Sequence, residues 1–195
     1  GSPVVLLTGA RQVGKSTLAR TLVPEERYLT LDDATLLAAA QADPTAFLGR
    51  HDQMVVIDEV QRVPELLLAI KAAVDRNRRS GRFLLTGSTS IRFVPRVADA
   101  LVGRMEILML WPFSQGEILE RGEGFLDAVR RARLPGEPSG VTAAEVAARI
   151  VRGGYPAVYT STERRRAAWL RSYVTGVLER DVRELSSIEA VAALP

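Results

Sequence analysis

The residues best suited to chemistry lie at the start of the chain, where Gly9 to Ser16 read G-A-R-Q-V-G-K-S. They match the pattern G-x-x-x-x-G-K-[ST], in which successive backbone N–H groups converge on phosphate oxygens. Gly9 and Gly14 allow the dihedral angles and the close approach that a Cβ would prevent. An apolar run before the pattern and helical spacing after it predict a strand, a loop and a helix. This is the context that a phosphate-binding loop requires.

Each polar residue of this loop has an expected role toward a bound nucleotide. The Lys15 ammonium can reach the β- and γ-phosphates and support reaction there, and the Ser16 hydroxyl can join the oxygen ligands of Mg²⁺. The sequence has no N-K-x-D guanine signature, so it favours ATP with Mg²⁺ over GTP. The expected nucleotide-binding residues are Gly9, Ala10, Arg11, Gln12, Val13, Gly14, Lys15, Ser16 and Thr17.

A pair of acids follows the most strand-like run of the chain. Met54 to Ile57 are apolar, and Asp58 and Glu59 come directly after them. Acids at the carboxyl end of a buried parallel strand face the edge where open α/β sheets bind ligands. Asp58 is therefore expected in the Mg²⁺ shell with Ser16, and Glu59 is expected to orient and polarise the attacking water. Without the upstream loop, an ordinary strand that ends in acids would be as good an interpretation of this run as a catalytic one.

Two further catalytic candidates follow the acid pair. Ser88 comes after a predicted strand and is expected to sense the γ-phosphate, with Thr86 and Thr89 as rivals and a helix cap as the alternative. Arg104, with Arg96 as the second choice, is expected to stabilise transition-state charge in its own chain or in a neighbouring subunit. The alternative for either arginine is a solvated position on the surface.

Apolar runs alternate with helical patterns through the first part of the chain. This alternation predicts an α/β fold, a parallel sheet with helices on both faces, in the additional-strand arrangement of P-loop nucleoside triphosphatases. Residues 1–115 are expected to form this core, and residues 116–195 a small helical appendage. Strands are predicted at 4–7, 28–31, 54–57, 82–86 and 105–110, and helices at 15–22, 34–42, 65–77, 112–121, 142–152 and 163–185.

Composition narrows the class of protein without identifying a role. The 195 residues carry a net charge of +3 and no cysteine, which excludes disulfides and thiolate metal sites. No run approaches the ~18 apolar residues of a membrane span, so no membrane partner and a cytoplasmic location are expected. The arginines of the 163–185 helix are interleaved with acids, which favours a self-paired, solvated helix over DNA binding. Gly1 and Ser2 are typical of a cloning remnant.

Several segments in a fixed order resemble those of prokaryotic AAA+ ATPases that carry a DUF4143 region. In that family an ATPase core precedes a winged-helix-like part and an α/β part likened to nucleases, so the chain resembles the core followed by the start of a truncated C-terminal domain. The resemblance implies the same roles for Lys15, Ser16, Asp58 and Glu59. The segments are T-G-A-R-Q-V-G-K-S-T from residue 8, Y-L-T-L-D-D from 28, V-V-I-D-E-V-Q from 55, L-L-T-G-S-T-S from 84, L-V-G-R from 101, L-W-P-F-S from 110, G-G-Y-P-A-V from 153, and Y-V-T-G-V-L-E-R-D-V-R-E-L from 173.

The resulting interpretation is a Mg²⁺-dependent ATPase of the AAA+ type that acts as a nucleotide-driven switch. Its ligands would be ATP and ADP, and its C-terminal region would act on an unidentified protein or nucleic-acid partner, with a homo-oligomer possible. Two alternatives stay open: a regulatory binding module with little turnover, and a P-loop kinase for a small molecule. A kinase needs an acceptor, so phosphate release without any acceptor distinguishes it from an ATPase.

Overall fold

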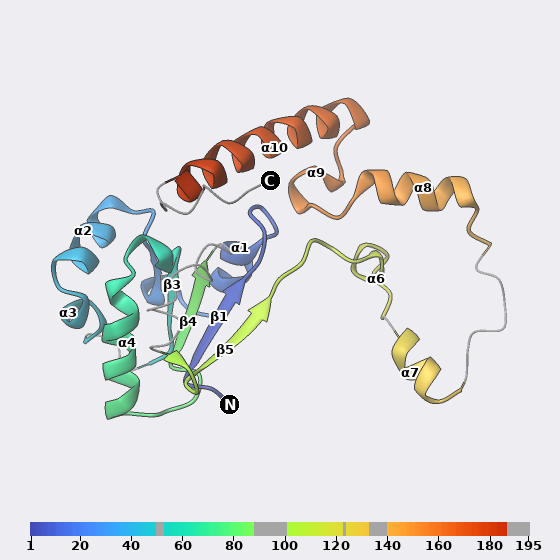
Figure 1. Cartoon of the computed structure of the whole chain (residues 1–195). Coiled ribbons are helices and arrows are strands. Elements are labelled where there is room, and N and C mark those ends of the chain that lie inside the picture. The colour runs from blue at the N-terminus through green and yellow to red at the C-terminus, as the bar shows by residue number, and fades with distance from the viewer. Residues whose placement is uncertain (50–52, 88–100, 123, 133–139, 187–195) are drawn as a thin grey trace. The chain divides into compact units, whose positions relative to one another are not determined.

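The chain forms two compact units. The computed structural model describes residues 1–49, 53–87, 101–122, 124–132 and 140–186 (Figure 1). The units are Gly1–Pro112 and Phe113–Pro195, whereas the sequence had placed the division after residue 115. Each unit is described by itself.

In the described residues, the first unit is built on a five-stranded sheet with the order β2-β3-β4-β1-β5. Every pair of neighbouring strands is parallel. Strand β4 lies between β1 and β3, which confirms the predicted additional-strand arrangement. The strands are β1 (Val4–Thr8), β2 (Tyr28–Thr30), β3 (Val55–Asp58), β4 (Phe83–Gly87) and β5 (Met105–Met109).

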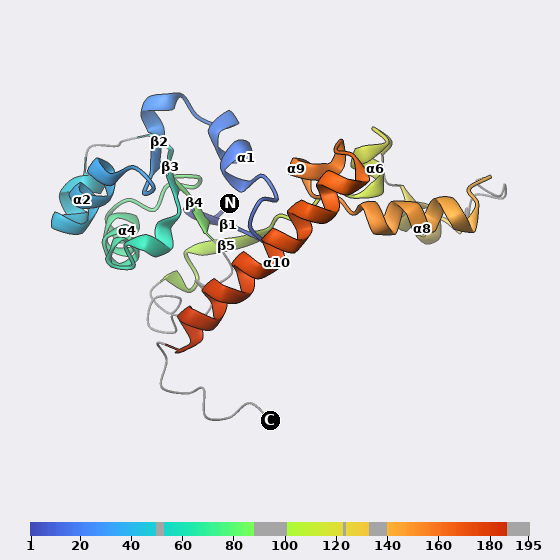
Figure 2. The same cartoon turned by 90° about the horizontal axis from the view of Figure 1, so that it is seen from above.

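Helices cover both faces of this sheet, as predicted, because side chains alternate along each buried strand. One face packs against α2 (Ala34–Ala42), α3 (Pro44–Leu48) and α4 (Glu65–Arg76), and the other against α1 (Lys15–Thr21). Figure 2 shows α1 and α4 on opposite sides of the strands. The first cluster includes Leu6, Ile57, Leu85, Leu66 and Ile70, and the second includes Leu7, Val56, Leu84 and Ala19.

Local signals explain where these helices begin. The Asp33 side chain accepts hydrogen bonds from the N–H groups of Thr35 and Leu36 at 2.8 and 2.9 Å, which caps α2. Asp43 caps α3 in the same way, and Pro44 occupies its first turn, where a missing N–H costs nothing. Short 3₁₀ turns at Glu25–Arg27 and Val60–Arg62 lead into β2 and toward α4.

The described residues of the second unit form helices joined by turns and loops, without a strand. Its helices are α6 (Gln115–Ile118), α7 (Phe125–Arg130), α8 (Ala143–Arg152), α9 (Pro156–Tyr159) and α10 (Glu163–Ser186). Reciprocal capping boxes start α6 at Ser114 and α8 at Thr142. Helix α6 is shorter than the predicted 112–121, because its box fixes the start at Ser114 and a turn ends it at Leu119.

Two contacts organise this unit. The Phe113 N–H donates to the Gly154 carbonyl at 2.9 Å, and a Cβ on Gly154 would lie 2.1 Å from the Phe113 carbonyl oxygen, so only glycine fits there. Tyr155 packs on Trp169 and Tyr173, whose rings stack with centroids 5.0 Å apart. The tryptophan is thus a packing residue. Within the described part of the chain, no helix has the length and apolar character needed to cross a membrane.

Candidate functional site

The predicted loop residues and the predicted acid pair come from one edge of the sheet. Because β1, β3 and β4 are parallel neighbours, their carboxyl ends lie side by side. The loop from Gly9 to Gly14 leaves β1 there and leads into α1 at Lys15, and Asp58 and Glu59 end β3 at the same edge. Parallel α/β sheets bind ligands at this edge.

The loop has a backbone that few residues other than glycine can adopt. Gly9 has a φ of 153°, and a Cβ there would lie 2.2 Å from the Leu110 carbonyl oxygen. Gly14 has a φ of 101° and Gln12 a φ of 64°. Left-handed positions that alternate with ordinary ones turn N–H groups to the same side, and such a turn forms an anion-binding concavity. The sequence placed both glycines in this role.

Lys15 folds back into this loop. Its Nζ donates to the carbonyl oxygens of Gly9 at 3.0 Å and Ala10 at 2.7 Å, and the residue is 6% exposed. Burial lowers the pKa of the ammonium below 10.5; the Glu59 and Asp58 carboxylates oppose that effect and Arg11 adds to it. The loop therefore encloses a positive charge whose partners are two neutral carbonyls. A negatively charged phosphate oxygen would be a stronger partner for this ammonium.

Ser16 and Asp58 meet at the mouth of the loop. The Ser16 hydroxyl donates to Asp58 Oδ1 at 3.0 Å, and the aspartate is 4% exposed. Mg²⁺ takes oxygen ligands and is held in nucleotide sites by few side chains together with phosphate oxygens. A hydroxyl beside a carboxylate fits that donor set. Among the described residues, no group of three or more histidine, cysteine or acidic side chains gathers that could hold a metal without such phosphates.

Glu59 is held in an unusual conformation beside this pair. Its φ is 59°, a left-handed value uncommon for residues with a Cβ. Its N–H donates to Thr86 Oγ1 at 3.2 Å, and its side chain accepts a hydrogen bond from the Gln61 amide. Thr86 therefore holds the backbone of Glu59, and Gln61 holds its carboxylate. Strained positions of this kind cluster at functional sites.

The structure does not bring Arg104 to the loop. This residue precedes β5, so it lies at the amino edge of the sheet, and its guanidinium makes two hydrogen bonds to Asp75 at 2.6 and 3.2 Å. The predicted phosphate-binding loop lies at the opposite edge, because β1 and β5 are parallel. Action of Arg104 on a neighbouring subunit's nucleotide stays a prediction.

Ser88 lies outside the described residues, as do Thr89 and Arg96. Thr86, the remaining rival for the sensor role, is fully buried and donates to Asp58 Oδ1. It therefore supports both acids through its hydroxyl, and any nucleotide-sensing role of Ser88 stays a prediction.

Three polar residues at this edge escaped the sequence reasoning: Tyr28, Thr30 and Gln61. The hydroxyls of Tyr28 and Thr30 donate to Asp58 Oδ2. Their alternation on β2 was visible in the sequence. Their meeting with Asp58 depends on β2 pairing with β3, which no local pattern specifies.

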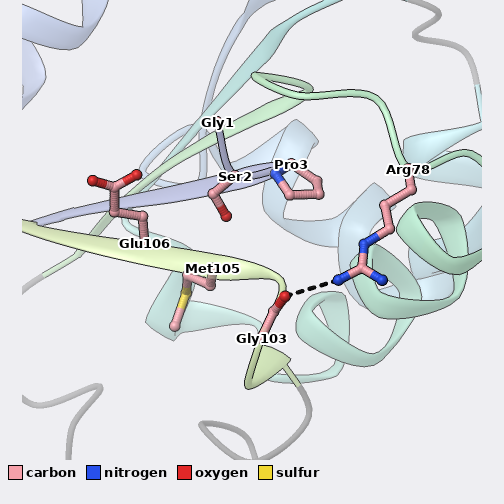
Figure 3. Close-up of a pocket in the computed structure, with 7 residues that line it drawn as sticks. All are labelled: Gly1, Ser2, Pro3, Arg78, Gly103, Met105 and Glu106. Atoms are coloured by element: carbon pink, nitrogen blue, oxygen red, sulfur yellow. Dashed lines mark hydrogen bonds between the residues drawn. The ribbon is translucent and has the colours of Figure 1, made fainter.

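A hollow of about 470 Å³ lies at the opposite edge of the sheet (Figure 3). Its arginine, Arg78, donates to the Gly103 carbonyl at 3.0 Å, as the dashed line shows. None of the predicted site residues that the structure describes lines it, although Gly103 precedes Arg104 in the chain, and we assign no function to it. The lining residues are Gly1, Ser2, Pro3, Arg78, Gly103, Met105 and Glu106.

Comparison with known proteins places the two parts of the chain separately. Residues 1–119 match the family model of an AAA domain, and residues 143–195 match a domain of unknown function, DUF8612. The second match is not to DUF4143, so that part of the resemblance is not shown. The AAA match covers the whole sheet and the loop.

Relatives and solved structures add little about the role. Uncharacterized proteins of Mycobacterium bovis and Mycobacterium tuberculosis are each 33% identical over 94% of this chain. The chain spans 37% of the length of each. A solved structure of C. elegans PCH-2 is 17% identical, covering 73% of this chain and 43% of that one with a TM-score of 0.38, too distant to support an argument.

Proposed function

The chain belongs to the AAA domain family, which its first 119 residues match, and on that premise we propose that it binds ATP with Mg²⁺ and hydrolyses the γ-phosphate. The first unit carries both parts that this reaction needs, a concave loop with a buried cation and a pair of acids at the same edge of the sheet. Such sites act by positioning and by electrostatic stabilisation more than by covalent chemistry.

One observation supports the proposal most strongly, the 3.0 Å contact between Ser16 Oγ and Asp58 Oδ1. The two residues belong to different elements, α1 and β3, and only the fold brings them together. A structural hydrogen bond alone would not need the buried Lys15 ammonium in the adjoining loop. The hydroxyl and the carboxylate are suited to bind Mg²⁺, and the ammonium is suited to bind phosphate oxygens. Together they fit a Mg²⁺–triphosphate.

The expected roles follow from these positions. Lys15 would exchange its two carbonyl partners for β- and γ-phosphate oxygens, and the loop N–H groups would hold the remaining oxygens. Ser16 and Asp58 would hold Mg²⁺, which when bound neutralises charge that develops on the phosphates. Glu59 would accept a hydrogen bond from the attacking water and orient it.

The wider role is also a proposal. Nucleotide-dependent change in the first unit would be passed to a protein or nucleic-acid partner through the second unit, whose matched family has no known function. The mycobacterial relatives are uncharacterized, so the partner, any homo-oligomer and the compartment are matters for experiment.

Isothermal titration of the chain with ADP and Mg²⁺ tests the binding part. The chain has two lysines, Lys15 and Lys71, which gives a matched pair of variants. We expect Lys15→Ala to weaken affinity by at least about tenfold, or ~1.4 kcal/mol, because it removes the enclosed cation. Lys71→Ala on α4 should bind like the unmodified chain. Equal affinities for both variants would mean that the loop is not the nucleotide site.

A further inference from the structure

Four hydroxyl groups surround the carboxylate of Asp58. Oδ1 accepts hydrogen bonds from Ser16 at 3.0 Å and from Thr86. Oδ2 accepts them from Tyr28 and, at 3.5 Å, from Thr30. A carboxylate offers about four acceptor positions, so each oxygen has two partners. Hydrogen bonds to both oxygens therefore set the rotation of the carboxylate about its Cβ–Cγ bond.

Tyr28 differs from the other three donors because its own ring is held in place. It lies at the start of β2, half-buried, and the Arg20 guanidinium lies 4.7 Å from the centre of its ring. Such a cation–π contact resists rotation of the ring out of the site. A residue of α1 thus fixes a side chain of β2, whose hydroxyl in turn fixes a carboxylate of β3.

We propose that Tyr28 is a positioning residue for Mg²⁺ in the nucleotide site. By holding Oδ2, its hydroxyl turns Oδ1 of Asp58 toward Ser16, where the ligands of the ion are expected. Tyr28 contacts Asp58 rather than the nucleotide, so it acts through the carboxylate. This inference rests on the proposed function, and its test is arranged to separate the two.

The test compares nucleotide affinity with and without the ion. Tyr28→Phe keeps the ring beneath Arg20 and removes only the hydroxyl. Binding of ADP is titrated in EDTA and then at rising Mg²⁺. We expect affinity in EDTA to stay within about twofold of the unmodified chain, because Tyr28 is not expected to contact phosphate. The Mg²⁺ concentration at half-effect should rise by about tenfold, the size expected for losing one hydrogen bond to a charged group.

A matched control is available in the second unit. Tyr159 also carries an arginine over its ring, with Arg152 at 5.8 Å from the ring centre. Tyr159→Phe makes the same chemical change at a residue that is not among the four donors to Asp58, so its Mg²⁺ dependence should equal that of the unmodified chain. Thermal unfolding of both variants confirms that each is folded.

A double-mutant cycle shows whether Tyr28 acts through the carboxylate. In an Asp58→Asn background, Tyr28→Phe should change the Mg²⁺ dependence by no more than about twofold, because the carboxylate through which Tyr28 acts is already absent. If Asp58→Asn does not fold, the comparison of Tyr28→Phe with Tyr159→Phe still decides the proposal.

The outcomes are distinct. An unchanged Mg²⁺ dependence in Tyr28→Phe, or an undiminished effect in the Asp58→Asn background, overturns the positioning role while nucleotide binding stands. Equal ADP affinities for Lys15→Ala and the unmodified chain overturn the proposed function, and the positioning role with it.

Discussion

Ser16 and Asp58 lie 42 residues apart in the chain, and the Ser16 hydroxyl reaches Asp58 Oδ1 across 3.0 Å. The contact joins the first turn of α1 to the end of β3, and β2 lies between these two elements in the sequence. It defines the mouth of the candidate site. The loop behind it encloses Lys15, and the residue after Asp58 is the acid proposed to orient water.

The ionisation of Lys15 provides a test that needs no nucleotide. Lysine labelled with ¹³C should give resolvable Cε signals, because the chain has only Lys15 and Lys71. We expect the pKa of Lys15 to lie below 10.5, since burial disfavours the ammonium more than the two carboxylates favour it. Added ADP should raise this pKa, because phosphate charge favours the ammonium. A Lys15 pKa at or above 10.5 without nucleotide would contradict the enclosed position.

Gly9 provides a test of the loop's backbone. Gly9→Ala places a Cβ 2.2 Å from the Leu110 carbonyl oxygen, so the loop or the end of β5 must shift. We expect the free energy of unfolding in urea to fall by about 1–3 kcal/mol, with weaker nucleotide binding. Gly122→Ala is the control, because nothing lies within 4 Å of its Cβ position. If both variants unfold alike, the loop does not approach Leu110 as described.

The loop and the acid pair were predictable because each is a local pattern. A short sequence fixes the turn after β1, and the apolar run before Asp58 fixes its place at a strand end. The network around Asp58 was not predictable in this way. Tyr28, Thr30 and Thr86 reach it because β2 and β4 flank β3, and strand order is a property of the whole sheet.

The position of Arg104 shows the other limit of sequence reasoning. Its closeness to the last strand suggested a place near the nucleotide. A residue that precedes a parallel strand lies at the amino edge, away from ligands bound at the carboxyl edge. The structure instead pairs it with Asp75.

That ion pair has a predicted pH signature. Hydrogen bonding to Arg104 lowers the pKa of Asp75 below its ordinary 3.8. The folded state then favours the charged carboxylate, so the stabilisation is present above pH 3.8 and is lost as pH falls through the lower folded-state pKa. We expect Asp75→Asn to unfold at lower urea than the unmodified chain at pH 7, with the difference shrinking below pH 3.8.

Asp127→Asn on α7 is the control for this comparison, since it removes an exposed acid from the second unit. Its midpoint should track that of the unmodified chain across the same pH range. If the difference in urea midpoint between Asp75→Asn and the unmodified chain is as large at acid pH as at pH 7, the ionised pair does not cause that difference. Nucleotide affinity should be unchanged in both variants.

Phosphate release from ATP by the chain, with Mg²⁺ and no acceptor molecule, is the most direct test of the proposed reaction. We expect single-turnover release in the unmodified chain. Glu59→Gln should keep its ATP affinity and release phosphate at least about 100-fold more slowly, because the lost carboxylate acts on the water mainly in the transition state. Release by Glu59→Gln at the unmodified rate, or no release until a small-molecule acceptor is added, would contradict ATP hydrolysis directed by Glu59.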